Sequence, residues 1–219
     1  MFFPRRTTPR GSIIWPVVYE ERRALIQDLE DLPSTQWQTP SLCPGWTVQD
    51  VLAHLTDTAK TTKLSFVRGM VTAGFDFDRA NASGIARERG AHSGAALAGF
   101  KAVQMRRTGP PAPLATRLVE AFIHGEDIRR PLGIRRTYPA PHVITALQYQ
   151  LKTTVKMGGG KEPAEGWRLV ATDAAFSHGS GPEIHGPAIV LLLAVSGRPV
   201  HSNELSGPGA EAFLSALAK

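Results

Sequence analysis

Residues 41–55 read SLCPGWTVQDVLAHL and contain a complete start signal for a helix. A Pro-Gly turn precedes Thr47, which can cap the helix, and Asp50 stands at the third helical position as the partner in a capping box. Apolar residues then recur at three- and four-residue steps. This spacing predicts a helix from Thr47 to about Met70 with one buried face, and His54 adjoins that face.

Outward from this segment, the same periodicity predicts three more helices, over residues 17–32, 81–107 and 113–130. Residues 1–16 are expected to form an irregular entry segment, because Pro4, Pro9 and Pro16 disfavour a regular helix. Residues 71–80 are expected to form a loop. Four helices with one apolar face each favour packing as a four-helix bundle.

The pattern changes after Tyr138. We expect helices near residues 142–155, 188–195 and 208–218, and short strands near 167–172, 174–176 and 183–185. The fold predicted from the sequence is therefore a helical bundle over residues 17–138, followed by a small α+β domain over residues 139–219.

Composition and charge narrow the classes of function. The net charge is +6, but no basic-aromatic module accompanies the arginines, which argues against nucleic-acid binding and leaves an anionic small substrate as the alternative. Cys43 is the only cysteine, which fits a reducing compartment. The longest apolar run, residues 188–195, is too short to cross a bilayer. A cytoplasmic protein without a membrane span is expected.

Three residues form a candidate metal site. Glu120 and His124 lie four residues apart, so they share one face of the predicted fourth helix. A surface pair or a core hydrogen bond would also explain this spacing. With His54 from the second helix, however, they make two imidazoles and one carboxylate, the ligand set of an open catalytic zinc site.

Two aspartates stand close to these candidate ligands. Asp50 precedes His54 by one turn, and Asp127 follows His124 by three residues. Either carboxylate could orient a ligand imidazole. The alternatives are a helix cap for Asp50 and an ion pair with Arg129 or Arg130 for Asp127.

The segment SLCPGWTVQDVLAHL (41–55) and the segment EAFIHGEDIRRPLG (120–133) together resemble the two metal motifs of the mycothiol-dependent maleylpyruvate isomerase family. The C-terminal half is similar to that family's second domain over residues 167–173, 179–186, 197–199 and 205–209. The resemblance implies a DinB-like bundle that holds zinc through His54, Glu120 and His124, and a small domain that closes over the site. It also implies a catalytic arginine from the second domain. Arg198, in a Gly-Arg-Pro motif, is the best match, and Arg168 is the alternative.

The function that follows from the resemblance is activation of mycothiol, as a zinc-bound thiolate, for addition to a small anionic electrophile. Cis-trans isomerisation and thiol transfer both fit this chemistry, and nickel, cobalt or iron could replace zinc. A zinc hydrolase is an alternative, but no separate general base stands out. A non-catalytic metal-binding protein is another. Cys43 is interpreted as a structural residue of a Pro-Gly loop, not as a nucleophile.

Overall fold

The computed structural model describes residues 10–217. Its helices are α1 (Arg10–Leu29), α2 (Val48–Lys60), α3 (Lys63–Thr72), α4 (Phe77–Glu88), α5 (Ser93–Lys101), α6 (Thr116–Arg129), α7 (Ala140–Gln150), α8 (Ala188–Val195) and α9 (Ala210–Leu217). The strands are β1 (Arg168–Ala171), β2 (Ser177–His178) and β3 (Glu183–Gly186). Short 3-10 turns lie at Ser34–Gln38, Val155–Met157, Glu162–Ala164 and Ser202–Glu204.

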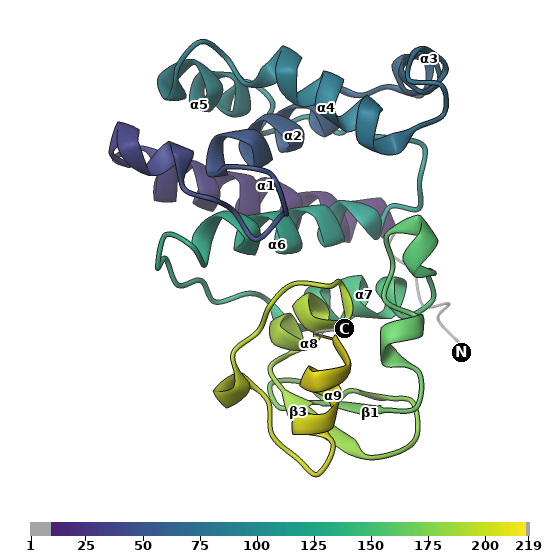
Figure 1. Ribbon diagram of the computed structural model, residues 1–219. Helices are drawn as coiled ribbons and strands as arrows, with labels where there is room; N and C mark the ends of the chain where they lie inside the picture. Colours follow the sequence, from purple (N-terminus) through teal and green to yellow (C-terminus); the bar gives the residue numbers. More distant parts are fainter. Residues whose placement is uncertain (1–9, 218–219) are drawn as a thin grey trace, which may run out of the picture.

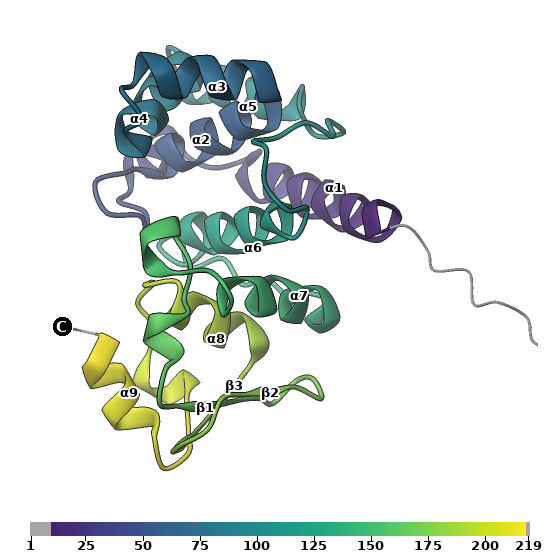
Figure 2. The same ribbon diagram turned by 90° about the vertical axis from the view of Figure 1, so that its right-hand side faces the viewer.

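Helices α1, α2, α5 and α6 form the predicted four-helix bundle, in which α1 and α2 each contact both α5 and α6. Helices α3 and α4 continue from α2 on the outer side of the bundle, and α4 packs along α2 (Figure 1). The turned view in Figure 2 shows the same layers, with α6 next to α7 and α8, and the sheet beyond them. The predicted fold class is confirmed.

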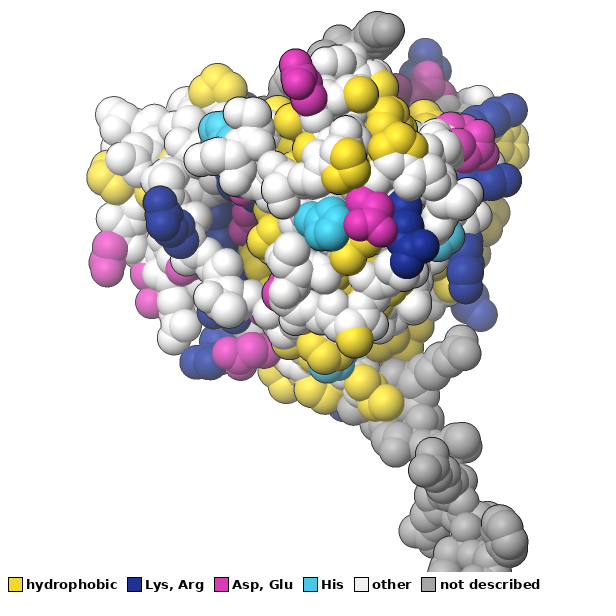
Figure 3. All heavy atoms as spheres, turned by 90° about the horizontal axis from the view of Figure 1, so that it is seen from below, with side chains coloured by type: hydrophobic (Ala, Val, Ile, Leu, Met, Phe, Trp, Pro, Cys, Tyr) yellow, Lys and Arg dark blue, Asp and Glu magenta, His cyan; other side chains and the backbone are white. Residues whose placement is uncertain are grey.

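The C-terminal half is built on a three-stranded sheet of order β2-β1-β3. Strand β1 pairs antiparallel with β2 and parallel with β3. From below, where the sheet lies, acidic, basic and histidine side chains are neighbours on the surface (Figure 3). Glu183 of β3 forms an ion pair with Arg168 of β1 (3.3 Å) and a hydrogen bond with His185 (2.8 Å).

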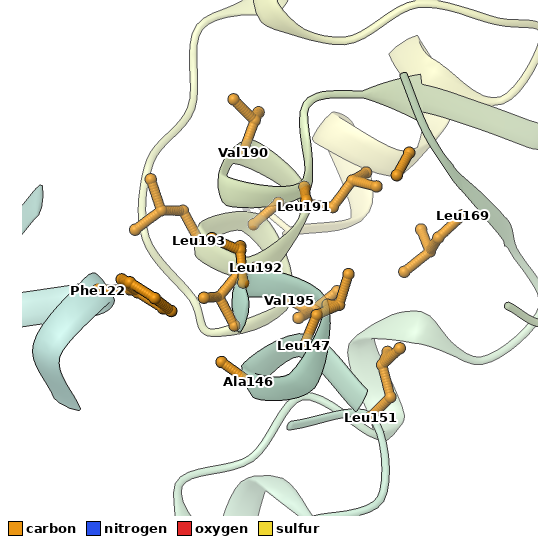
Figure 4. Packing of buried hydrophobic residues seen from close by; sticks show 14 of the residues in the cluster. Phe122, Ala146, Leu147, Leu151, Leu169, Val190, Leu191, Leu192, Leu193 and Val195 are labelled. Carbon is orange, nitrogen blue, oxygen red and sulfur yellow. The ribbon is translucent and has the colours of Figure 1, made fainter. Parts of the chain in front are cut away.

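The largest hydrophobic core joins the two halves of the molecule. It contains Ile14 and Val18 of α1 and Phe122 of α6 together with the apolar side chains of α7, α8, β1 and β3. Figure 4 shows Phe122 extending from α6 toward the leucines of α8. A second core fills the bundle between α1, α2 and α5.

Two of the expected helices are each divided in the structure. The helix expected from Thr47 to Met70 ends at Lys60, because Thr62 caps a new helix through a capping box with Ser65. As a result, α3 covers the start of the expected loop, and α4 begins at Phe77.

The helix expected over residues 81–107 is also two helices. Gly90 has a φ of 70°, and the His92 ring accepts a hydrogen bond from the backbone N–H of Ala95 to cap α5. A positive φ is costly for residues other than glycine, so the break falls at this glycine.

The first helix begins earlier than expected. Helix α1 starts at Arg10 and runs through Pro16, where an irregular segment was predicted. Ile14, Trp15 and Val18 are buried in the core around the proline, and this packing offsets its missing N–H. Pro4 and Pro9 lie outside the described residues.

Smaller differences lie in the second half. The strand expected near residues 174–176 is the two-residue β2, just downstream, while β1, β3 and α8 form where predicted. Among residues 10–217 there is no helix with the length and apolar character that crossing a bilayer requires.

Candidate functional site

A short loop before α2 forms one wall of the site. Pro44 and Gly45 turn the chain, with the Trp46 N–H donating to the Cys43 carbonyl at 3.1 Å and Gly45 at a φ of 78°. The Ser41 hydroxyl donates to the Trp46 carbonyl at 2.8 Å. The N–H of Leu42 donates to the carbonyl of Asp127 at 3.2 Å, which fixes the loop against α6.

The two candidate histidine ligands lie next to each other. Their ring centroids, one from α2 and one from α6, are 4.9 Å apart with the planes nearly perpendicular. The Trp46 ring lies 5.0 Å from His54 and 6.5 Å from His124. The sequence-based expectation that α2 and α6 face each other at these histidines agrees with this geometry.

His54 is held in its neutral form. Burial, and then repulsion from His124, lower its pKa from 6.5 to about 3. Its ring makes no hydrogen bond to any other part of residues 10–217. A neutral buried imidazole with free nitrogens is the form that a metal ion binds.

Asp127 connects His124 to the C-terminal half. Its Oδ2 lies 2.8 Å from His124 Nδ1, and both carboxylate oxygens accept hydrogen bonds from Arg198, at 2.9 and 3.0 Å. Burial alone raises the pKa of Asp127, but the hydrogen bonds from His124 and Arg198 lower it below its ordinary value. The ionised carboxylate keeps the hydrogen on Nδ1 of His124, so Nε2 is free to bind a cation.

The Gly-Arg-Pro motif explains how Arg198 reaches this site. After α8, the N–H of Gly197 donates to the Ala194 carbonyl at 3.1 Å and the N–H of Arg198 donates to the Leu193 carbonyl at 3.0 Å. This pair of bonds is a Schellman motif, and it requires the φ of 72° that Gly197 adopts. The chain therefore turns back at Gly197 and directs Arg198 toward α6.

The other candidate arginine lies elsewhere. Arg168 is on β1 and pairs with Glu183 on β3, at the sheet end of the molecule. Between the two candidates, Arg198 is the one that contacts the residues around His124.

Glu120 does not lie with the two histidines. Its Oε2 accepts a hydrogen bond from Nη1 of the buried Arg117 at 3.1 Å. Both residues line a small cavity between α1, α2, α5 and α6, which Arg22 also lines. Among the described residues, one group of His, Cys, Asp or Glu side chains has three potential metal-donor atoms within 4.8 Å of one another. It consists of Cys43, His124 and Asp127.

Cys43 is the site residue that sequence reasoning missed. Its Sγ accepts a hydrogen bond from Nη2 of Arg198 at 3.3 Å. Burial raises the pKa of the Cys43 thiol, and the positive charge of Arg198 opposes that effect. The only sequence signal was the position of Cys43, four residues before the cap of the helix that carries His54.

Two of the three predicted donors, His54 and His124, are placed to bind a divalent metal, and Glu120 is not. Two adjacent imidazoles, one neutral and one oriented by a carboxylate, offer nitrogen ligands, and Glu120 is one helical turn before His124. Glu120 would have to exchange Arg117 for the ion. The ligand set His54, Glu120 and His124 therefore stays a prediction, and its nitrogen half has the required proximity.

Comparisons with known proteins agree with the resemblance. Residues 18–108 match the family model described as "Mycothiol maleylpyruvate isomerase N-terminal domain". Two solved structures have similar folds: the mycothiol-dependent maleylpyruvate isomerase (TM-score 0.64) and a histidine-to-alanine mutant of it (TM-score 0.63). Each is 16% identical in sequence, and each alignment covers 91% of this chain and 93% of the other. No curated protein matches the chain in sequence.

Proposed function

Over residues 18–108 the chain belongs to the mycothiol maleylpyruvate isomerase N-terminal domain family, and from this premise we propose that it is a zinc enzyme that uses mycothiol as cosubstrate. The substrate we propose is a small anionic electrophile with a conjugated double bond. Isomerisation of maleylpyruvate is the reaction named for the structural relatives, and it is the first one to test.

The zinc ligands in this proposal are His54, Glu120 and His124. When bound, zinc would supply a Lewis acid that favours the thiolate form of a thiol at neutral pH. The chain's own contribution is to present His54 as a neutral base and to hold His124 in one tautomer through Asp127. Both effects lower the cost of binding a cation at this point of the bundle.

Arg198 is the proposed anion-binding residue. A guanidinium has five N–H groups, and four of those of Arg198 are used by Asp127, Cys43 and the Ser196 carbonyl. The remaining N–H of Nη1 is available to a substrate carboxylate or enolate. Because Asp127 fixes the guanidinium, this donor is preorganised.

In the proposed isomerisation, the thiolate of mycothiol adds to the conjugated double bond and the electron pair moves to the carbonyl oxygen as an enolate. Rotation about the new single bond follows. Return of the electron pair then expels the thiolate, which is regenerated unchanged. Arg198 would stabilise the enolate charge. In a thiol transferase the carbon–sulfur bond would be retained, and the enolate carbon would take up a proton from solvent instead of expelling the thiolate.

The observation that carries the proposal is the 4.9 Å approach of the His54 and His124 rings, with His124 bonded through Asp127 to Arg198. The proposed cosubstrate must remain reduced, which fits the cytoplasmic location that we propose.

Elemental analysis combined with a thiol-dependence assay tests this function. We expect about one zinc per chain and turnover of maleylpyruvate only with added mycothiol. Glu120→Ala should lose the metal and the turnover, whereas Cys43→Ala should keep the metal. Loss of metal in Cys43→Ala but not in Glu120→Ala would move the site to Cys43, His124 and Asp127. Hydrolytic turnover without thiol would favour a metal-dependent hydrolase instead.

A further inference from the structure

A small cavity inside the bundle is lined by two arginines. Arg22 comes from α1 and Arg117 from α6, and these two helices lie side by side in Figure 2. The cavity has a volume of about 20 Å³, enough for roughly one water molecule. The acidic residues that also line it are Glu21 and Glu120. The partners of these four charged groups decide what the cavity can bind.

Glu120 is the acidic residue of the lining that pairs inside the cavity. Its Oε2 accepts a hydrogen bond from Nη1 of Arg117 at 3.1 Å. Glu21 instead accepts two hydrogen bonds from Arg136, at 3.0 and 3.3 Å. Arg22 donates to three backbone carbonyls that follow α5, and it forms no ion pair with another of residues 10–217. Two guanidinium groups in the cavity therefore depend on one carboxylate.

The guanidinium of Arg117 is fixed beside this carboxylate. Its side chain is 5% exposed, Nη2 donates to the Pro110 carbonyl at 3.4 Å, and Gly109 lies so close to Nη1 that a Cβ there has no room. Burial lowers the pKa of Arg22, the negative charge of Glu120 opposes this effect, and the positive charge of Arg117 adds to it. An unpaired buried charge is costly, so Arg117 requires an anion at the position that Glu120 fills.

The position of the Glu120 carboxylate is open to solvent. The Glu120 side chain is 24% exposed, whereas that of Arg117 is buried. Glu120 also lies one helical turn before His124, and in the proposed function it leaves Arg117 to bind the metal. Its departure would leave a space of the size of a carboxylate, bordered by solvent and by the Arg117 guanidinium.

We propose that Arg117 and Arg22 form a binding site for a small carboxylate. Glu120 fills this site in the metal-free chain, and an external carboxylate fills it when Glu120 binds the metal. For the metal-bound state the inference rests on the proposed function, in which the external carboxylate is an anionic group of the electrophilic substrate. A guanidinium and a carboxylate match in charge and in planar geometry. The vacated space has the shape of a carboxylate, so acetate should bind there better than the larger, tetrahedral sulfate.

This exchange makes the metal and the carboxylate bind cooperatively. Without an external anion, metal binding breaks the pair of Arg117 with Glu120 and leaves Arg117 unpaired. An external carboxylate restores a hydrogen bond to a charged group, which should raise metal affinity roughly tenfold or more. Because linkage is reciprocal, the metal should raise carboxylate affinity by the same factor.

Chemical rescue tests the carboxylate site without any metal. Glu120→Ala leaves Arg117 buried and unpaired, so the metal-free full chain should unfold at a lower temperature. Sodium acetate, compared with sodium chloride at the same ionic strength, should raise this temperature by roughly 3–5 °C at about ten times its dissociation constant. The double variant Glu120→Ala, Arg117→Met is the matched control and should show no acetate-specific shift. Sodium sulfate should have a smaller effect than acetate.

Zinc affinity tests the cooperativity in the unmodified full chain, so the proposal stays testable if Glu120→Ala does not fold. Acetate should raise the affinity roughly tenfold or more, as measured by competition with a chelator. Arg117→Met should bind zinc equally well with and without acetate, after correction for the zinc that acetate binds in solution. Arg198→Lys should keep the acetate effect, which distinguishes this site from the anion-binding residue of the proposed function.

Three results would overturn the proposal. Acetate could stabilise Glu120→Ala no more than the double variant, it could change the zinc affinity of the unmodified chain and of Arg117→Met equally, or its effect could disappear in Arg198→Lys. None of these results contradicts zinc binding by the unmodified chain, which elemental analysis measures separately. Rescue of Glu120→Ala in a chain that binds no zinc would support the carboxylate site and contradict the proposed function.

Discussion

Arg198 and Asp127 are joined by two parallel hydrogen bonds, from Nε to Oδ1 at 2.9 Å and from Nη2 to Oδ2 at 3.0 Å. The two residues are 71 positions apart and come from different halves of the molecule. Oδ2 also lies 2.8 Å from Nδ1 of His124, so the Asp127 carboxylate connects the segment after α8 to a candidate metal ligand.

Replacing Asp127 with Asn should weaken both metal binding and the fold. The amide cannot satisfy His124 and Arg198 together, so metal affinity should fall roughly 10- to 100-fold, as measured by competition with a chelator. Thermal or denaturant unfolding should show a loss of about 3 kcal/mol, because Arg198 loses its buried counter-ion. Glu183→Gln, which removes an exposed ion pair, is the matched control and should cost under about 1 kcal/mol. Unchanged metal affinity in Asp127→Asn would exclude the orienting role.

Arg198→Lys should lower kcat with little change in metal content. Lysine keeps the charge but cannot reproduce the two parallel hydrogen bonds to Asp127, so the anion-binding donor is no longer fixed. We expect a loss of roughly 100-fold in kcat, as for removal of a preorganised donor. Arg168→Lys is the control and should stay within about twofold of the unmodified chain. Equal losses in both variants would contradict the assignment to Arg198.

Arg117→Met should raise metal affinity. The methionine keeps the apolar bulk beside Gly109 but releases Glu120 from its ion pair, so the carboxylate no longer has to be exchanged. A hydrogen bond to a charged group contributes about 1.5–3 kcal/mol, which corresponds to a gain of roughly tenfold or more. Chelator competition measures the affinity, with Arg79→Met as the exposed control. A decrease would mean that Arg117 positions Glu120 for the metal.

The stability of the metal-free protein should depend on pH through His54. Its pKa is about 3 in the folded chain and 6.5 ordinarily, so between these values the unfolded chain binds more protons. The free energy of unfolding should therefore be highest above pH 6.5 and should fall as the pH decreases toward 3, with a slope of at most about 1.4 kcal/mol per pH unit. Denaturant unfolding at several pH values measures the slope. His54→Gln should reduce it, and an unchanged slope would show that His54 is not buried as a neutral ring.

The sequence predicted the elements whose signals are local. The Thr47–Asp50 capping box, the helix α6 and the short apolar α8 formed where periodicity and capping residues placed them. The breaks at Thr62 and Gly90 were missed because the apolar spacing continues across them, while competing caps at Thr62 and His92 restart the helix.

The candidate site was only partly predictable for a different reason. The 4.9 Å approach of His54 and His124 follows from the packing of α2 on α6, which amphipathic faces indicate. The Arg198–Asp127 pair and the position of Cys43 depend on how the C-terminal half docks on α6. No local pattern encodes such long-range contacts. The pair of Arg117 with Glu120 has the local i,i+3 spacing, but that spacing does not tell which partner the carboxylate takes.

The bundle and the sheet domain share one apolar core, which contains Ile14, Val18, Phe122 and the side chains of α7 and α8. Neither half can be removed without exposing part of this core. A protein fragment that ends near residue 138 would expose the apolar side chains of α1 and α6 to water and would therefore be prone to aggregate. Sequence change in the C-terminal half is thereby constrained, because α7 and α8 must keep the apolar side chains that pack with Phe122.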